Sequence, residues 1–148
     1  LMILLALTER VAMRLRRLGY MVSLVSVSIK TGGFVHYSHQ MKLRNSIDTT
    51  TEIYEHVCML FDQCWKGEPI RKLGVHVSDF QASGTRQYSL FDRRDDEKLR
   101  ALDRTVDKIR EKYGTRSIIR GSFTNGDINP VQGGTNDSDF IMMGGYRQ

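Results

Sequence analysis

The chain has 148 residues, 40% of them hydrophobic and 26% charged, so it is long enough for one folded domain with an appendage and is not a disordered polyelectrolyte. Its net charge of +5 and pI near 9.4 allow nucleic acid or an acidic surface as partner and require neither. Cys58 and Cys64 lie too far apart on one predicted helix to form a disulfide, which favours reduced thiols and the cytoplasm.

The chain opens with an apolar run from Leu1 to Leu7. This run lacks the basic leader and cleavage site of a signal peptide and is too short to span a membrane, so we expect no membrane partner. It is better explained as part of a buried helix, which suggests a fragment of a larger protein. We predict that this helix ends at Gly19. Its apolar stripe comprises Leu4, Leu7, Val11, Leu15 and Leu18.

Three later segments alternate between apolar and polar residues, which is typical of strands with one buried face. The first begins at Val25, and a turn at Gly32-Gly33 separates it from a second run over 37–44. The third covers 72–78. Between them, Thr49-x-x-Glu52 is a capping box that starts a second helix. The buried stripe of that helix comprises Ile53, Val57, Leu60, Phe61 and Cys64.

A separate helix is predicted from about Arg94 to Tyr113, followed by a short strand at Ser117–Phe123 and a flexible tail over 124–148. The helix has apolar residues at alternating spacings of three and four, as in a helix that docks on a partner or on itself. These residues are Leu99, Leu102, Val106, Ile109 and Tyr113.

The order of these elements predicts an α+β fold, in which an antiparallel sheet carries two helices on one face and is followed by a helical appendage. The other face of the sheet would be lined by small hydroxyl and basic side chains. Such a surface suits a phosphate backbone and is poorly suited to reading bases. An ordinary solvated sheet face is the alternative explanation. The polar residues are Ser26, Ser28, Lys30, Ser38, Gln40, Lys42, Arg44, His76 and Ser78.

A short motif follows the third strand: Gln87, Tyr88, Ser89, Leu90 and Phe91. It resembles the peptide by which bacterial DNA polymerases and repair proteins bind the sliding clamp. An extended peptide of this kind offers a glutamine amide as anchor and a Leu-Phe pair to fill an apolar pocket. Alternatively, Leu90 and Phe91 pack back on the domain.

Several segments resemble the little-finger domain of Y-family DNA polymerases, the DinB/UmuC or ImpB/MucB/SamB type. They are Val11–Gly19, Ser26–Lys30, Thr50–Tyr54 with Leu60-Phe61, and, most characteristically, Pro69–Ser78. The clamp-like motif stands where these polymerases keep theirs. The helix ending in Ile109–Gly114, with Ile119–Phe123, is similar to the tail of UmuC-like and Gram-positive members. The resemblance covers about residues 1 to 123.

The resemblance implies an error-prone lesion-bypass polymerase whose little finger grips the primer–template duplex, largely independently of sequence. On this reading, the polar face of the sheet contacts the DNA, and we expect those contacts from Ser26, Ser28, Lys30, Ser38, Lys42, Arg44, His76 and Ser78. It also implies a four-stranded sheet whose first strand precedes the first helix, and this chain lacks that strand. We therefore expect either Ser117–Phe123 or a second copy of the chain, as a homodimer, to fill the open edge.

Polymerase chemistry requires carboxylates that bind two magnesium ions, and in this family they lie in the palm domain. The nearest string here, Ser46-Ile47-Asp48-Thr49, lacks the glutamate and is better explained as a helix cap. The cysteines and histidines show no metal-ligand spacing. We therefore expect no catalytic residue, no metal and no cofactor in this fragment, and no polymerase activity.

The predicted organisation is a little-finger domain over 1–81, a linker with the clamp motif over 82–93, a helix and short strand over 94–123, and the tail. A competing hypothesis is a protein-interaction module. In that case the sheet face is idle, and the 94–113 helix docks on a recombinase filament or a polymerase accessory subunit. An enzyme ranks third, because no nucleophile–base pair stands out.

Overall fold

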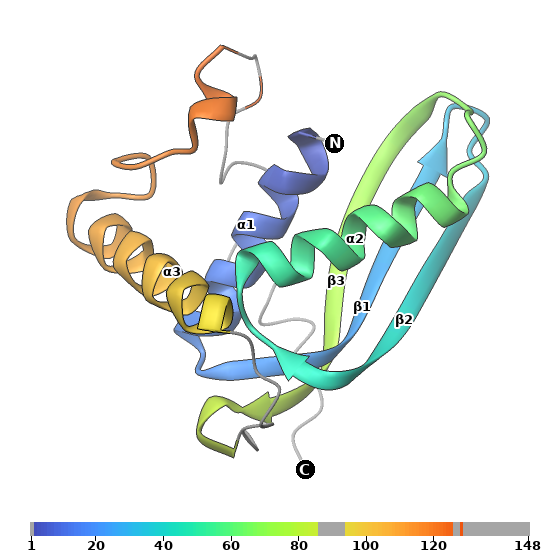
Figure 1. Ribbon diagram of the computed structural model, residues 1–148. Coiled ribbons are helices and arrows are strands. Elements are labelled where there is room, and N and C mark those ends of the chain that lie inside the picture. The colour runs from blue at the N-terminus through green and yellow to red at the C-terminus, as the bar shows by residue number, and fades with distance from the viewer. Residues whose placement is uncertain (1, 86–93, 126–127, 129–148) are drawn as a thin grey trace.

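The computed structural model describes residues 2–85, 94–125 and 128. It has the predicted α+β fold: a three-stranded antiparallel sheet in the order β2-β1-β3, with α1 and α2 on one face and α3 beside α1 (Figure 1). The elements are α1 (Met2–Arg17), β1 (Tyr20–Thr31), β2 (His36–Ile47), α2 (Thr50–Cys64), β3 (Ile70–Ala82), a 3-10 turn (Ser83–Thr85), α3 (Arg94–Tyr113) and a second 3-10 turn (Gly121–Phe123).

The core lies between the sheet and the two helices, and β1 is its centre. Val25, Val27 and Ile29 are fully buried under α1 and α2, which confirms the predicted alternation of this strand. The α2 stripe predicted from the sequence packs against them. Within the described residues, no helix is long and apolar enough to cross a membrane.

Both predicted helix boundaries have a local cause. Gly19 adopts φ +74° at the end of α1, a conformation that favours glycine, and its amide donates to the Arg16 carbonyl (3.0 Å). At the start of α2, the Thr49 hydroxyl oxygen accepts from the Glu52 amide (3.2 Å), as the capping box predicts. Leu18, which was placed on the buried stripe, is instead exposed, because it follows the last turn of α1.

The hairpin between β1 and β2 turns at Gly32-Gly33 as predicted, but the left-handed residue is Phe34, with φ +65°. Its exposed ring lies between two cations: Lys30 Nζ is 5.1 Å and the Arg71 guanidinium 4.5 Å from the ring centroid. Cation–π attraction therefore helps to hold an otherwise unfavourable backbone conformation.

Strand β2 does not keep one register along its length. Val22 pairs with Ile47 and Leu24 with Lys42, so a step of two residues on β1 spans five on β2. The strand bends at this irregularity, as β-bulges do. Arg44 lies inside it and is exposed, so it does not continue the row of polar side chains that the alternation predicted.

The prediction of a short strand at Ser117–Phe123 is wrong. This segment forms bends followed by the second 3-10 turn, and it does not join the sheet. The Ile118 carbonyl already accepts from the Arg110 guanidinium (3.2 and 3.1 Å), and Phe123 is buried. These contacts hold the segment beside the helices, so it cannot fill the open sheet edge.

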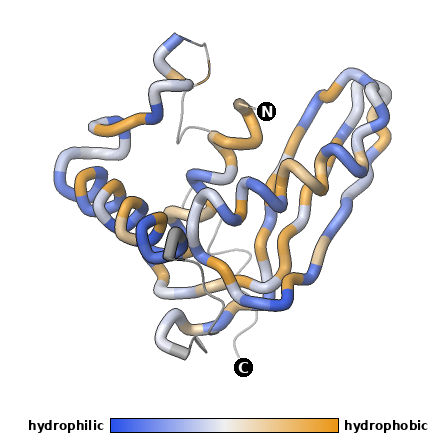
Figure 2. Tube along the Cα trace, in the orientation of Figure 1, coloured by the Kyte–Doolittle hydropathy of each residue, from blue (hydrophilic) through white to orange (hydrophobic). Residues whose placement is uncertain are grey.

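Helix α3 has the predicted bounds, and its predicted apolar seam is half-buried at Leu99, Val106 and Ile109 but exposed elsewhere. Leu102 and Tyr113, which belong to the apolar seam, are 54% and 67% exposed, and α3 mixes hydrophilic and hydrophobic residues along its length (Figure 2). The side chains buried against α1 are Asp103 and Arg110. Charged pairs therefore hold α3 against α1.

Arg16 of α1 is the centre of this contact, and its side chain is only 10% exposed. Its Nε and Nη2 donate to the two carboxylate oxygens of Asp107 (2.6 and 3.0 Å), and its Nη1 donates to Asp103 Oδ2 (3.1 Å). Asp103 also accepts from the Thr50 amide at the start of α2 (2.7 Å). One guanidinium thus joins three helices.

A second buried carboxylate, Glu9 of α1, accepts from Arg110 of α3 (3.4 Å) and from Arg120. Each arginine thus meets an opposite charge, which buried ionic groups require. We call Arg16, Asp103, Asp107, Glu9, Arg110 and Arg120 the α1–α3 charge network.

Candidate nucleic-acid interface

The face of the sheet opposite the helices is open and polar. Because the strands are antiparallel with known register, its side chains form rows across β2, β1 and β3. The rows are Lys42–Leu24–Ser78, Gln40–Ser26–His76, Ser38–Ser28–Gly74 and His36–Lys30–Lys72. We call these four rows the open face.

The middle of the open face carries small side chains, so its surface lies closer to the backbone there than at the two ends. We call this part the low centre. Gly74 lies opposite Ser28, and a Cβ atom at Gly74 would stand 2.6 Å from Ser28 Oγ and 3.0 Å from His76 Nε2. Ser28 Oγ and His76 Nε2 are hydrogen-bonded to each other at 3.1 Å. A Cβ atom at this position would displace the Ser28 hydroxyl, so glycine favours this close packing and leaves the surface above it accessible to a partner's backbone.

Positive charge is concentrated at the two ends of the open face. Lys30 and Lys72 are cross-strand partners near the hairpin, where Arg71 also lies against Phe34. At the other end, Lys42 Nζ lies 3.4 Å from Asp79 Oδ2, with the two side chains 74% and 44% exposed. An ion pair this exposed is weak, so Lys42 stays accessible to a stronger anionic partner.

The structure brings most of the residues predicted for DNA contact onto the open face, and Arg44 lies in the adjoining irregular part of β2. Sequence reasoning missed Lys72, although it has the same alternation phase as His76 and Ser78. It also missed Asp79, because φ +56° at this residue breaks the alternation that placed Ser78.

Other predicted features lie away from the open face. The clamp-like motif over 87–91 falls outside the described residues. Within the described part of the chain, no group of three or more His, Cys, Asp or Glu side chains is arranged to hold a metal ion. Cys58 and Cys64 are free and partly buried, and burial raises the pKa of the Cys64 thiol.

Comparison with known proteins identifies the family. Residues 1–90 match the model of the impB/mucB/samB family C-terminal domain. The chain belongs to this family. The match confirms the resemblance to the little-finger domain of Y-family polymerases, and it ends within the clamp-like motif.

Three relatives show how much of a longer protein the little-finger chain represents. It is 40% identical to DNA polymerase IV of Clostridium acetobutylicum, over 80% of this chain and 30% of that protein. It is 36% identical to DNA polymerase IV 2 of Halalkalibacterium halodurans, over 80% of this chain and 29% of that protein. It is 35% identical to DNA polymerase IV 2 of Bacillus subtilis, over 81% and 29%. The chain therefore spans less than a third of the length of these relatives.

Proposed function

We propose that this chain is the DNA-binding part of an error-prone translesion DNA polymerase that acts in DNA repair and the response to DNA damage. Its open face would hold the primer–template duplex through the phosphate backbone. The observation that carries the proposal is the row geometry, with a low centre of Ser28, Ser38 and Gly74 between basic ends. Small side chains allow close approach, and the cations replace counterions along the backbone.

The test is duplex binding by fluorescence anisotropy, with two unrelated duplex sequences over a series of salt concentrations. The variant Lys30→Gln/Lys42→Gln/Lys72→Gln removes three charges from the open face. If each cation meets one phosphate, the slope of log K against log salt should fall by about 2 to 3 for both duplexes. A loss confined to one duplex would contradict backbone recognition.

A matched control removes the same three charges from elsewhere. Lys66, Lys98 and Lys112 are exposed and lie off the open face, so Lys66→Gln/Lys98→Gln/Lys112→Gln changes net charge equally. We expect it to leave the slope close to that of the parent chain. Equal losses in the two variants would reduce the interaction to general attraction and remove the open face from the interface.

The chain alone is proposed to lack polymerase activity, with magnesium chemistry supplied by a palm domain outside it. The string Ser46–Thr49 supports this. Asp48 lies 3.5 Å from the Arg100 guanidinium, and Thr49 caps α2, so both residues have structural contacts. Primer extension by the purified chain with magnesium and nucleotides would overturn this proposal.

The segment Gln87–Phe91 is proposed to bind the bacterial sliding clamp, with Leu90 and Phe91 in an apolar pocket and Gln87 fixing the register. The test is binding of purified clamp to the chain beside a Leu90→Ala/Phe91→Ala variant. We expect micromolar binding, on the order of −8 kcal/mol, to be lost in the variant. Equal binding by both chains would assign the segment to packing.

Pairing of two copies through an outer strand also remains a proposal. Both β2 and β3 have one unpaired edge in the described sheet, and unpaired edges favour strand addition. Sedimentation of the purified chain over a range of concentrations tests for the homodimer. A monomer at every concentration would exclude the homodimer.

A cytoplasmic location is also proposed. It depends on the proposed function on DNA and would be withdrawn if the chain did not bind DNA.

A further inference from the structure

A second basic surface lies between α1 and α3, away from the open face. It is a groove of about 510 Å³, lined by residues of the two helices and by Thr115. Among the described residues that line it are six cations and two carboxylates, an excess of four positive charges. The cations are Arg10, Arg14, Arg16, Arg17, Arg104 and Lys108.

Helical spacing explains why these cations gather there. On α1, Arg10, Arg14 and Arg17 follow the i, i+4, i+7 pattern that places side chains on one face. On α3, Arg104, Lys108 and Glu111 repeat the same pattern. The core-facing residues of α1 lie on another side of the helix. The groove is therefore a surface separate from the open face.

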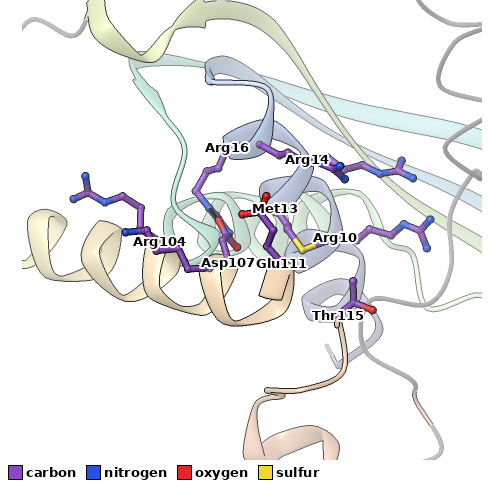
Figure 3. Close-up of a pocket in the computed structure, with 10 residues that line it drawn as sticks. Arg10, Met13, Arg14, Arg16, Arg104, Asp107, Glu111 and Thr115 are labelled. Carbon is purple, nitrogen blue, oxygen red and sulfur yellow. Dashed lines mark hydrogen bonds and ion pairs between the residues drawn. The ribbon is translucent and has the colours of Figure 1, made fainter. Parts of the chain in front are cut away.

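The charges of the groove differ in their roles. Arg16 is bound by Asp103 and Asp107 and holds the two helices together. The remaining cations extend to both sides of this contact, with Arg104 on one side and Arg10 and Arg14 on the other (Figure 3). An extended polyanion matches such a track better than one isolated phosphate.

The chemistry of the lining favours a phosphate backbone. Guanidinium groups donate in pairs to phosphate oxygens, and five of the six cations are arginines. The lining residues that the structure describes include no aromatic ring on which an unpaired base could stack. A ligand would therefore be recognised through its phosphates and not through its bases.

We propose that the α1–α3 groove binds the phosphodiester backbone of a second nucleic-acid segment, separate from the duplex on the open face. This proposal rests on the proposed function only in assigning nucleic acid as the partner. The segment could be a single strand or another duplex, and the two share the same phosphate chemistry. A chain loaded with duplex on its sheet would then still bind a second segment.

The experiment uses the full 148-residue chain and the variant Arg17→Gln/Arg104→Gln/Lys108→Gln. All three residues are exposed, so folding should be retained, which circular dichroism checks. Labelled oligothymidylate is titrated into the chain alone and into the chain loaded with one equivalent of unlabelled blunt duplex. We expect binding in both cases and a loss of at least about tenfold in the groove variant. The Lys66/Lys98/Lys112 control should bind like the parent.

Five outcomes are informative. Retained oligothymidylate binding in the groove variant, or an equal loss in the matched control, would overturn the groove site. Complete displacement of oligothymidylate by one equivalent of blunt duplex, with no second equivalent of duplex bound, would do the same, since one surface would then serve both. Equal competition by polyglutamate of matched charge would also overturn it, by assigning the groove to acidic protein segments. A second equivalent of duplex that only the groove variant loses would support the site with duplex as its source.

Duplex binding by the open face and nucleic-acid binding by the α1–α3 groove can be refuted independently of each other. The open-face variant Lys30→Gln/Lys42→Gln/Lys72→Gln should lose blunt duplex and keep oligothymidylate. If the parent chain does not bind blunt duplex at all, the proposed function fails, and the oligothymidylate titration still measures the groove.

Discussion

The open face and the α1–α3 charge network both depend on basic residues, but those residues have opposite tasks. In the network, Arg16 is nearly buried and donates to two carboxylates and to the start of α2. On the open face, Lys42 is 74% exposed and has one weak carboxylate partner. Burial and a full set of acceptors make a cation structural, whereas exposure beside small residues makes it available to a partner.

The largest expected effect is on stability and comes from the α1–α3 charge network. Arg16→Ala leaves Asp103 and Asp107 without their main counter-charge in a largely buried site, so the free energy of unfolding should fall by about 3–5 kcal/mol. Urea denaturation measures it, and trypsin should cleave α3 faster. The neighbouring Arg17→Ala is the control, because Arg17 is exposed and should cost no more than about 0.5 kcal/mol.

If Arg16→Ala yields no folded protein, Arg16→Lys retains the charge and removes the paired donation to Asp107. We expect an intermediate loss of stability. A change below about 1 kcal/mol in both Arg16 variants would show that the network does not hold α3 in place.

The next prediction concerns the centre of the open face. Gly74→Val places side-chain atoms against Ser28 and His76, and such overpacking should cost about 1–3 kcal/mol in stability while weakening duplex binding. The double variant Ser28→Ala/Gly74→Val relieves the closest contact and should recover part of the stability but not the affinity. Ser28→Ala alone controls for the lost hydroxyl. Full recovery of affinity in the double variant would argue against a need for a low centre.

A smaller effect should come from the partner of Lys42. Asp79→Asn removes a negative charge from the open face and releases Lys42, so duplex affinity should rise about two- to threefold at low salt. Asparagine tolerates the φ of +56° at this position, so the backbone should not change. Asp62→Asn, on α2, is the charge-matched control, and an equal gain there would contradict the specific role of Asp79.

The smallest prediction concerns Cys64. Burial raises the pKa of its thiol, so less thiolate is present at mildly alkaline pH than for an ordinary cysteine, and alkylation in the folded chain should be slow. The unfolded chain ionises first as pH rises. The stabilising contribution of the neutral thiol is therefore complete below the unfolded pKa and is lost as pH rises through the folded pKa. Mass spectrometry of iodoacetamide-treated Cys58→Ser chain against pH tests this, with urea-unfolded chain as reference.

Much of the fold could be predicted, because the relevant signals are local. The capping box at Thr49, the glycine stop at Gly19 and the alternation of β1 each depend on residues within one or two turns. Period-two alternation predicts which residues lie on the open face. This prediction fails at Arg44, where the register of β2 shifts, and the alternation does not extend to Asp79, where the backbone has a positive φ. Irregularities of this kind depend on how two strands meet, which neither strand encodes alone.

The segment after β3 shows the opposite case. Apolar spacing on α3 predicts a docking seam, of which Leu102 and Tyr113 are exposed while Leu99, Val106 and Ile109 are half-buried. The strand predicted at Ser117–Phe123 does not form. The ion pairs between α3 and α1 come from Asp103, Asp107 and Arg110, residues that a sequence pattern assigns to a solvated face. Their partners, Arg16 and Glu9, lie about a hundred residues away along the chain.

The sequence by itself determined the helices, the three strands of the sheet, the polarity of the two sheet faces and the family, because these depend on short-range periodicity and local motifs. Only the tertiary structure decided which arginines are structural and which are exposed. It also decided where α3 docks and that a basic groove forms beside it. Charged side chains owe their roles to partners distant in sequence, and those partners meet only when the chain has folded.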